Sequence, residues 1–199
     1  MSMNENSDKK EKPRLPPGQH ITERFPVLQK GRIPNIEREK YILEFHGEIE
    51  NPMKFTLKEL MILQDKEIVA DIHCVTSWSK FDTRWGGISF NKIFELVKPK
   101  PAANYVEFCC ADDGFTTTVP IENLYAENTI LALTYDGEPI PEKHGGPVRP
   151  IIPNLYFYKS AKWVLKINFL KEDRLGYWER AGYSNKADPW KQQRYSSND

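Results

Sequence analysis

Residues 71–79 read DIHCVTSWS and place one cysteine, Cys74, where an apolar run gives way to small and hydroxylated residues. The apolar run consists of Ile68, Val69, Ala70 and Ile72. It predicts a buried strand that ends at Cys74, and the residues after it predict a loop. Because cysteine is among the most buried residue types, a core residue is the simplest interpretation. A cysteine that binds a metal or reacts is the alternative, and the rest of the chain has to decide between them.

The composition indicates one globular domain without a strongly charged partner. The chain has 199 residues, of which 39% are hydrophobic and 12% aromatic. Lys and Arg together number 28, as do Asp and Glu, and this balance gives no sign of a nucleic-acid or acidic-membrane partner. Three cysteines, an odd number, argue against a disulfide framework and favour a reducing compartment. No apolar run approaches the roughly 18 residues of a membrane span, and we therefore expect a cytoplasmic protein.

The two ends of the chain are polar and differ from its middle. Residues 1–18 are charged, rich in proline and poor in apolar groups, which predicts a disordered lead-in and not a secretory signal. Residues 19–199 have a globular composition and predict a single domain. Within this domain, the polar stretch 186–199 is expected to fray.

Short strand-like and helix-like segments alternate along the domain and predict an α+β fold with mixed sheets and short helices. Strands are expected at 41–47, 67–73, 105–110, 116–119, 129–135 and 161–170. Helices are expected at 56–63, 90–97 and 120–125. Thr56 and Glu59 have the spacing of a capping box, and Ser89 can cap the second helix. In the last strand, the residues expected on one face are Trp163, Leu165, Ile167 and Phe169.

The chemistry open to Cys74 depends on its surroundings. A cysteine acts as a nucleophile or metal ligand only as a thiolate, so a cation or a metal has to lower its pKa. His73 is adjacent, but successive side chains of a strand point to opposite faces, which argues against a Cys–His pair. The three cysteines and four histidines lack the spacing typical of a zinc site. Cys109 and Cys110 are most simply two successive residues of a strand.

Two further segments carry cations beside proline, glycine or serine. The segment 139–153, PIPEKHGGPVRPIIP, surrounds His144 and Arg149 with rigid backbone, and arginine suits bidentate recognition of phosphate. In the KSAKW stretch that follows, Ser160 and Lys162 point to the same side if the backbone is extended, and both can reach a phosphate. The alternatives are a surface loop with a solvated arginine and an ordinary strand edge.

The segment 176–184, GYWERAGYS, combines three aromatic residues with a glutamate and an arginine. A tyrosine such as Tyr183 can orient an oxygen atom or donate a proton, and an arginine such as Arg180 can hold an anion. An aromatic core cluster is the alternative interpretation.

Taken in chain order, these motifs resemble the sulfite oxidase-like family of molybdopterin-dependent oxidoreductases. The motifs are CVxxWS at 74–79, an acidic turn ending at Gly114, HGGPVR at 144–149, SxKW at 160–163 and WExxGY at 178–183. The resemblance covers residues 19–199 and is closest to the small cytoplasmic bacterial members without a haem or dimerisation domain. It implies a mixed α/β fold built around one molybdenum–molybdopterin.

The resemblance also implies roles for individual residues. Cys74 matches the cysteine whose thiolate binds molybdenum, and Tyr183, with Arg180 nearby, matches the position that orients the substrate oxygen. The positions that match contacts to the pterin and its phosphate are Arg24, Phe25, Asp112, His144, Arg149, Ser160, Ala161 and Lys162. Asp113 replaces Asp112 if the match is one residue out.

The implied activity is two-electron oxygen-atom transfer to or from a small substrate, either a sulfite-like anion or an S- or N-oxide. True sulfite oxidases have an arginine shortly after the ligand cysteine, whereas residues 75–79 here read VTSWS, and Arg84 is the candidate to replace it. Because no haem domain is expected, electrons have to be exchanged with a separate protein. The alternatives are a binding or assembly module on the same fold and a thiol redox protein that uses Cys74 or the pair Cys109 and Cys110.

Overall fold

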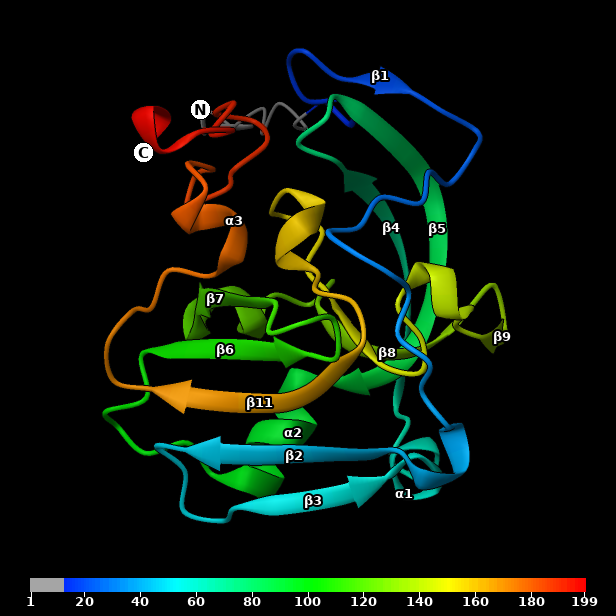
Figure 1. Ribbon diagram of the computed structural model, residues 1–199, viewed down its shortest axis with the longest axis vertical. Coiled ribbons are helices and arrows are strands. Elements are labelled where there is room, and N and C mark those ends of the chain that lie inside the picture. The colour runs from blue at the N-terminus through cyan, green and yellow to red at the C-terminus, as the bar shows by residue number, and fades with distance from the viewer. Residues whose placement is uncertain (1–12) are drawn as a thin grey trace, which may run out of the picture.

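Two sheets form the frame of the molecule in the computed structural model, which describes residues 13–199 (Figure 1). One sheet has six strands, in the order β1-β5-β8-β10, with β4 paired to β5 and β9 paired to β8. Its strands are β1 (His20–Ile21), β4 (Lys66–His73), β5 (Trp78–Ser89), β8 (Ile130–Tyr135), β9 (Glu138–Pro139) and β10 (Arg149–Ile151). The five strands of the other sheet, in spatial order, are β3 (Met53–Thr56), β2 (Ile42–Gly47), β11 (Val164–Leu170), β6 (Tyr105–Cys110) and β7 (Thr116–Pro120). Both sheets combine parallel and antiparallel pairs, which confirms the predicted α+β class.

The helices are short and begin where the sequence predicts caps. The α-helices are α1 (Leu57–Ile62), α2 (Phe90–Val97) and α3 (Tyr177–Arg180). The 3-10 helices are η1 (Arg38–Lys40), η2 (Ile121–Tyr125), η3 (Glu142–His144), η4 (Phe157–Lys159) and η5 (Ser196–Asn198). Thr56 and Glu59 form the predicted capping box of α1, and the Ser89 hydroxyl accepts a hydrogen bond from the Lys92 amide at the start of α2.

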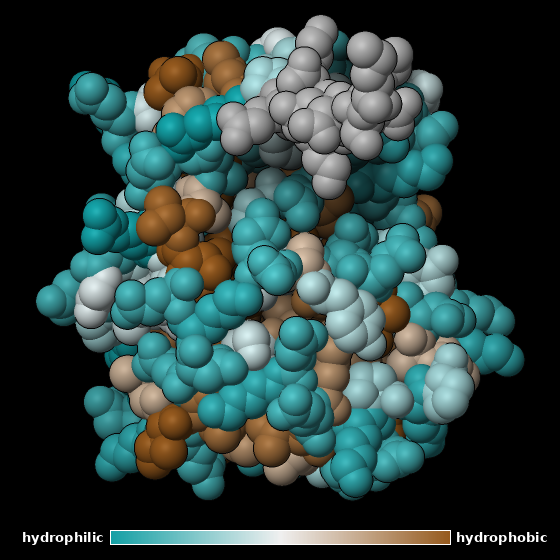
Figure 2. Space-filling model, turned by 180° about the vertical axis from the view of Figure 1, so that it is seen from behind, coloured by the Kyte–Doolittle hydropathy of each residue, from teal (hydrophilic) through white to brown (hydrophobic). Residues whose placement is uncertain are grey.

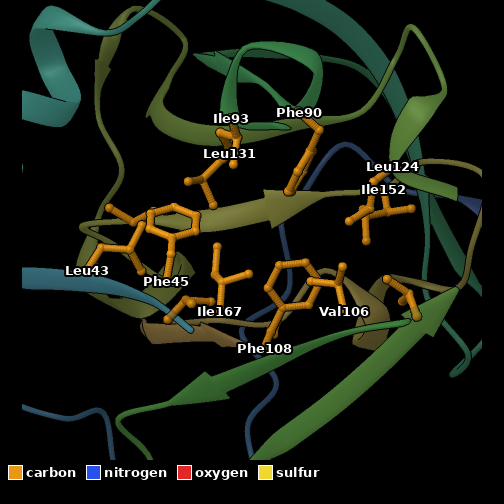
Figure 3. Close-up of a cluster of buried hydrophobic side chains, with 14 of the residues drawn as sticks. Leu43, Phe45, Phe90, Ile93, Val106, Phe108, Leu124, Leu131, Ile152 and Ile167 are labelled. Atoms are coloured by element: carbon orange, nitrogen blue, oxygen red, sulfur yellow. The ribbon is translucent and has the colours of Figure 1, made fainter. Parts of the chain in front are cut away.

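The main core lies between the five-stranded sheet, helix α2 and strand β8 (Figure 3). In Figure 3, side chains from α2 and β8 point toward side chains from the five-stranded sheet. The buried residues at this contact include Leu43, Phe45, Phe90, Ile93, Val106, Phe108, Leu131 and Ile167. Truncating one such side chain to alanine typically costs about 2–5 kcal/mol of unfolding free energy. This core joins residues of both sheets, and the loops that connect the strands start from it.

The last predicted strand departs from simple alternation. Strand β11 begins at Val164, and its pairing with β6 shifts register between Val164 and Lys166. This irregularity buries Val164 and leaves Leu165 38% exposed, so the predicted common face is wrong at Leu165. Trp163 precedes the strand with a φ of 58°, which takes it out of the alternation. Ile167 and Phe169 are buried as expected.

The loop predicted after Cys74 is much shorter than expected. A turn at residues 74–77 joins β4 to β5, and β5 then runs for 12 residues, a strand that the sequence reasoning missed. Asp82 inside β5 has a φ of 55°, and the pairing of β4 with β5 shifts register between Ala70 and Ile72. Such irregularities hide a strand from a search for strict alternation. Cys74 therefore lies in a tight turn between two long paired strands.

The polar ends are anchored within the described part of the chain. Residues 1–12 of the predicted lead-in lie outside the described residues, whereas Pro16 is buried and Arg14 forms ion pairs with Asp71 and Asp82. The predicted fraying of residues 186–199 is wrong, because Ala187 is buried and Asp199 accepts hydrogen bonds from Ser184 and Asn185.

Polar side chains dominate the face shown in Figure 2, and apolar side chains appear there in separate small groups. Across residues 13–199, no helix is long and apolar enough to cross a membrane.

Candidate functional site

A cavity of about 300 Å³ lies where the connecting segments of both sheets meet. It brings together nine of the residues that the sequence predicts for the site, namely Phe25, Cys74, Asp112, His144, Arg149, Ser160, Ala161, Lys162 and Tyr183. These residues come from six different segments of the chain, and side chains from the same segments complete the wall. A volume of this size is typical of small-molecule and cofactor sites.

The Cys74 turn is held by residues from both ends of the chain. The Cys74 carbonyl accepts hydrogen bonds from the Ser77 amide, at 3.0 Å, and from Gln19 Nε2, also at 3.0 Å. Arg194 donates to the carbonyl of Val75 and, at 3.3 Å, to the carbonyl of Gly18. The backbone that carries the thiol is therefore held by residues that lie far away in the sequence.

The Cys74 side chain is 8% exposed and lines the cavity together with Val75, Thr76 and Trp78. Burial raises the pKa of the Cys74 thiol, whereas hydrogen bonds from Thr76 and the charge of Arg194 lower it. His73 points elsewhere, because its Nδ1 lies 2.9 Å from the Ser79 hydroxyl and its ring packs edge-on against Trp190. As predicted, His73 and Cys74 form no catalytic pair, and a bound metal would be needed to hold the thiolate.

Arg149 clamps two loops together at the wall of the cavity. Its Nη1 donates to the His144 carbonyl at 2.7 Å, and its Nη2 donates to the Ser160 carbonyl. The guanidinium is 2% exposed and lies 4.3 Å from the centre of the Phe157 ring. Gly145 completes the clamp, because its φ is 101° and an added Cβ would lie 2.8 Å from Cγ of Lys162. Two nitrogens of the Arg149 guanidinium are therefore used within the framework, and Nε is left without a protein partner at the cavity wall.

Lys162 is the cation best placed to bind an anion at this end. Burial, with the charge of Arg149 second, lowers its pKa to about 8, and Asp112 opposes both. Its Nζ makes two long hydrogen bonds, of 3.3 Å to Gln29 Oε1 and 3.5 Å to the Lys143 carbonyl, and lies 4.1 Å from the centre of the Trp163 ring. Burial, with Arg149 second, lowers the pKa of His144 to about 4, so the imidazole is neutral at pH 7 and offers one N–H group.

An extended segment at residues 24–33 crosses one side of the cavity, and Figure 1 shows it running between β1 and η1. Phe25 anchors it, because the phenyl ring stacks on the His144 imidazole with centroids 4.0 Å apart and an angle of 11°. Residues 26–30 line the cavity, and Lys30 Nζ donates to the Asp113 carbonyl at 3.0 Å. Sequence reasoning found Phe25 but missed residues 26–30, which carry no motif.

An aromatic wall made of Tyr158, Trp178 and Tyr183 closes the other side. A buried ion pair supports it, because Lys159 Nζ lies 2.6 Å from Glu179 Oε1, with both side chains at most 1% exposed. Glu179 Oε1 also accepts a hydrogen bond from the Thr117 hydroxyl at 2.6 Å. The pair therefore ties η4 and α3 to β7 and fixes the neighbouring aromatic rings.

Three arginines considered from the sequence do not line the cavity. Arg180 is exposed and donates to the Leu175 carbonyl, and Arg24 is exposed on the extended segment. Arg84 is exposed on β5, so it does not replace the arginine of sulfite oxidases. Asp112 lines the cavity and Asp113 does not, which supports the first of the two alignments.

The residues of the cavity suit the molybdenum–pterin that the motifs imply. Three buried polar atoms of its wall have no partner within the described protein: Trp78 Nε1, Asp112 Oδ1 and Arg149 Nε. Buried polar atoms are normally paired, so these atoms mark positions where a polar ligand is expected. A soft thiolate such as that of Cys74 suits molybdenum, and Lys143 with Lys162 suits a phosphate. In the described chain, no cluster of three or more His, Cys, Asp or Glu side chains forms a separate metal site.

Comparison with known proteins identifies the family. Residues 30–178 match the family model described as oxidoreductase molybdopterin binding domain. The uncharacterized oxidoreductase YuiH of Bacillus subtilis is 41% identical over 184 residues, which cover 92% of each chain. The putative protein-methionine-sulfoxide reductase subunit YedZ1 of Azospira oryzae is 30% identical over 84% of this chain and 64% of its own.

More distant relatives agree with this assignment. The catalytic subunit MsrP, a protein-methionine-sulfoxide reductase of Campylobacter jejuni, is 26% identical over 73% of this chain and 54% of its own length. The sulfane dehydrogenase SoxCD of Paracoccus pantotrophus has the same fold, with a TM-score of 0.63 at 18% identity over 70% of this chain and 40% of that chain. These findings confirm the predicted fold, enzyme class and cofactor. The chain therefore belongs to the oxidoreductase molybdopterin-binding domain family and is a molybdopterin-dependent oxidoreductase.

Proposed function

We propose that this enzyme reduces uncharged S-oxides, with Cys74 as the protein ligand of molybdenum. The observation that carries the proposal is the chemistry of the Cys74 turn, which brings Val75, Thr76 and Trp78 to the cavity wall and no cation. A site for the sulfite dianion needs positive charge near the metal, because electrostatic complementarity decides which ligand is preferred. A neutral S-oxide needs a polar contact for its oxygen and apolar contacts for its carbon groups.

The positive charge of the site belongs to other elements. Lys143 and Lys162 lie on the loops that Arg149 clamps, and they would hold the phosphate of the pterin together with Ser160 and the backbone of Ala161. Arg194 acts electrostatically on Cys74, but its guanidinium donates to backbone carbonyls and does not line the cavity. Sulfite would therefore meet little free positive charge beside Cys74.

When bound, the cofactor supplies two-electron oxygen-atom transfer. The residues around it supply ligation, orientation and exclusion of water. Cys74 would hold the metal in a rigid turn, and the Tyr183 hydroxyl would donate a hydrogen bond to the oxygen of the S-oxide. Trp178 and Tyr158 would pack against the carbon groups of the substrate. The balanced reaction takes up two electrons and two protons and releases a sulfide and one water.

The electrons would come from a separate redox protein, as the sequence reasoning expected. Two relatives are named as subunits, YedZ1 and MsrP, and both names refer to reduction of methionine sulfoxide. These names support both the direction of the reaction and a separate electron donor. The family match favours this enzyme over the binding-module and thiol-redox alternatives, and burial raises the pKa of all three cysteines, which also disfavours thiol chemistry. The cytoplasmic location stays a prediction.

The test compares two reactions of one purified preparation. Molybdenum and pterin are first quantified, and the protein is then assayed for reduction of methyl sulfoxides with a reduced viologen dye. Oxidation of sulfite is assayed with ferricyanide on the same sample. We expect kcat/KM for the sulfoxide to exceed that for sulfite by at least about 10-fold, the cost of one missing hydrogen bond between charged groups. A preference for sulfite would contradict the proposal.

A further inference from the structure

The side chain of Thr76 is directed at the sulfur of Cys74. Thr76 Oγ1 lies 3.1 Å from Cys74 Sγ, inside the range for a hydrogen bond to sulfur. In the metal-free protein either atom can be the donor. Once the cysteine is a thiolate it has no proton to give, so the threonine hydroxyl has to donate. When a metal is bound, we therefore expect the hydrogen bond to persist with Thr76 Oγ1 as the donor and Cys74 Sγ as the acceptor.

The turn is rigid enough to hold this contact. The Cys74 amide donates to the Trp78 carbonyl at 2.8 Å, and the Cys74 carbonyl accepts from the Ser77 amide at 3.0 Å. Gln19 and Arg194 bind the outer carbonyls of the same turn. Thr76 itself is exposed, so we expect that its side chain can be changed without disturbing the core.

We propose that Thr76 is a positioning residue that donates its hydroxyl to the Cys74 thiolate and thereby weakens electron donation from the sulfur to molybdenum. The inference rests on the proposed role of Cys74 as the metal ligand. Groups behind a metal ligand orient it and tune the metal, and hydrogen bonds to cysteine sulfurs are among the factors that set the reduction potential of metal centres. A donor on the sulfur stabilises extra electron density there and favours the reduced metal.

The sign of the effect follows from this direction. Without the hydroxyl, the sulfur donates more strongly, the oxidised metal is favoured, and the midpoint potential becomes more negative. A hydrogen bond to a charged group is stronger than one between neutral groups, and only part of its strength differs between oxidation states. We therefore expect the reduction equilibrium constant to fall about tenfold, which is about 59 mV for a one-electron couple.

The experiment uses molybdenum-loaded full-length protein and four variants. Thr76→Val removes the hydroxyl and keeps the branched shape of the side chain. Thr76→Ala removes both, and Thr76→Ser keeps the hydroxyl. Thr129→Val is the matched control, because the hydroxyl of Thr129 bonds to the Asn123 carbonyl and this residue does not line the cavity. The readouts are the molybdenum content, the sulfur-to-molybdenum charge-transfer band and the midpoint potential from a titration followed by electron paramagnetic resonance.

We expect a lower potential and a shifted band in Thr76→Val and Thr76→Ala, and wild-type values in Thr76→Ser and Thr129→Val. Equal potentials in all variants, with molybdenum bound, would overturn the role of Thr76 and leave the proposed function intact. A wild type without molybdenum and pterin, prepared in a host that makes the cofactor, would instead overturn the role of Cys74 and this inference with it.

Discussion

The turn at residues 74–77 and the loop at 144–149 line the same cavity, but their charged and polar groups are used differently. At the turn, the Cys74 side chain faces the cavity, and distant residues hold only the backbone. At the loop, the most conspicuous side chain, Arg149, binds the backbone carbonyls of His144 and Ser160. Two of the guanidinium nitrogens of Arg149 therefore hold the framework and only Nε is left without a protein partner, whereas the whole Cys74 side chain is presented at the cavity wall.

The largest effect is expected at the buried ion pair that supports the aromatic wall of the same cavity. Glu179→Gln leaves the Lys159 ammonium buried without its charged partner and should lower the unfolding free energy of the cofactor-free protein by about 3–5 kcal/mol. Urea denaturation measures it. Lys54→Gln is the control, because it removes the Lys54–Glu44 pair, which is largely exposed at Lys54, and should cost less than about 1 kcal/mol. Equal costs in the two variants would show that burial of the pair is irrelevant.

Replacement of Cys74 tests whether the side chain at the turn takes part in the reaction. Cys74→Ser should lower kcat/KM for sulfoxide reduction by more than about 100-fold, because changes behind a metal ligand already cost 10- to 100-fold. The protein should stay folded, with its charge-transfer band lost or shifted. Cys109→Ser is the matched control, since Cys109 lies on β6 away from the cavity and should behave as the wild type. Full activity in Cys74→Ser would remove Cys74 from the mechanism.

Replacement of Arg149 tests whether its hydrogen bonds to two carbonyls stabilise the folded protein. Arg149→Lys keeps a positive charge but cannot bond both carbonyls, so we expect the unfolding free energy of the cofactor-free protein to fall by about 2 kcal/mol. Chemical denaturation without cofactor measures this directly. If the stability were unchanged and only cofactor binding were lost, Arg149 would be a ligand residue and the contrast drawn above would be wrong.

The smallest effect is expected at Lys162. Its ammonium makes only long hydrogen bonds to the protein, so we expect it to bind an anion more readily than Arg149. Lys162→Met should weaken binding of sulfate, a phosphate analogue of constant charge, to the cofactor-free protein by about tenfold at pH 7, as measured by calorimetry. In the wild type, the sulfate affinity should fall as the pH rises through about 8, where the buried Lys162 loses its proton.

The same lowered pKa has a second consequence for Lys162. Between pH 8 and the ordinary lysine value of 10.5, the unfolded chain binds more protons than the folded one, so the unfolding free energy rises with pH in this window. Lys162→Met should abolish both pH dependences. A pH-independent sulfate affinity in the wild type would place the anion away from Lys162.

The elements that follow local rules could be predicted from the sequence. The capping box at Thr56, the cap at Ser89 and the hairpin of β6 and β7 all depend on neighbours within a few residues, and all three are confirmed. Strand β5 was missed, and Leu165 was placed on the wrong face, because register shifts interrupt the alternation. Such irregularities depend on the pairing partner, which a local pattern does not contain.

By itself, the sequence determined the family, the cofactor class and nine side chains of the cavity, because these are fixed by residue types at set spacings. Only the tertiary structure decided how each residue is used. It turned Arg149 inward onto two carbonyls, left Arg180 outside, and brought residues 26–30 and Arg194 to the site from the two ends of the chain. The physical reason is that hydrogen-bond partners and burial depend on long-range packing, and the same side chain binds a ligand or a carbonyl according to which one lies within about 3 Å.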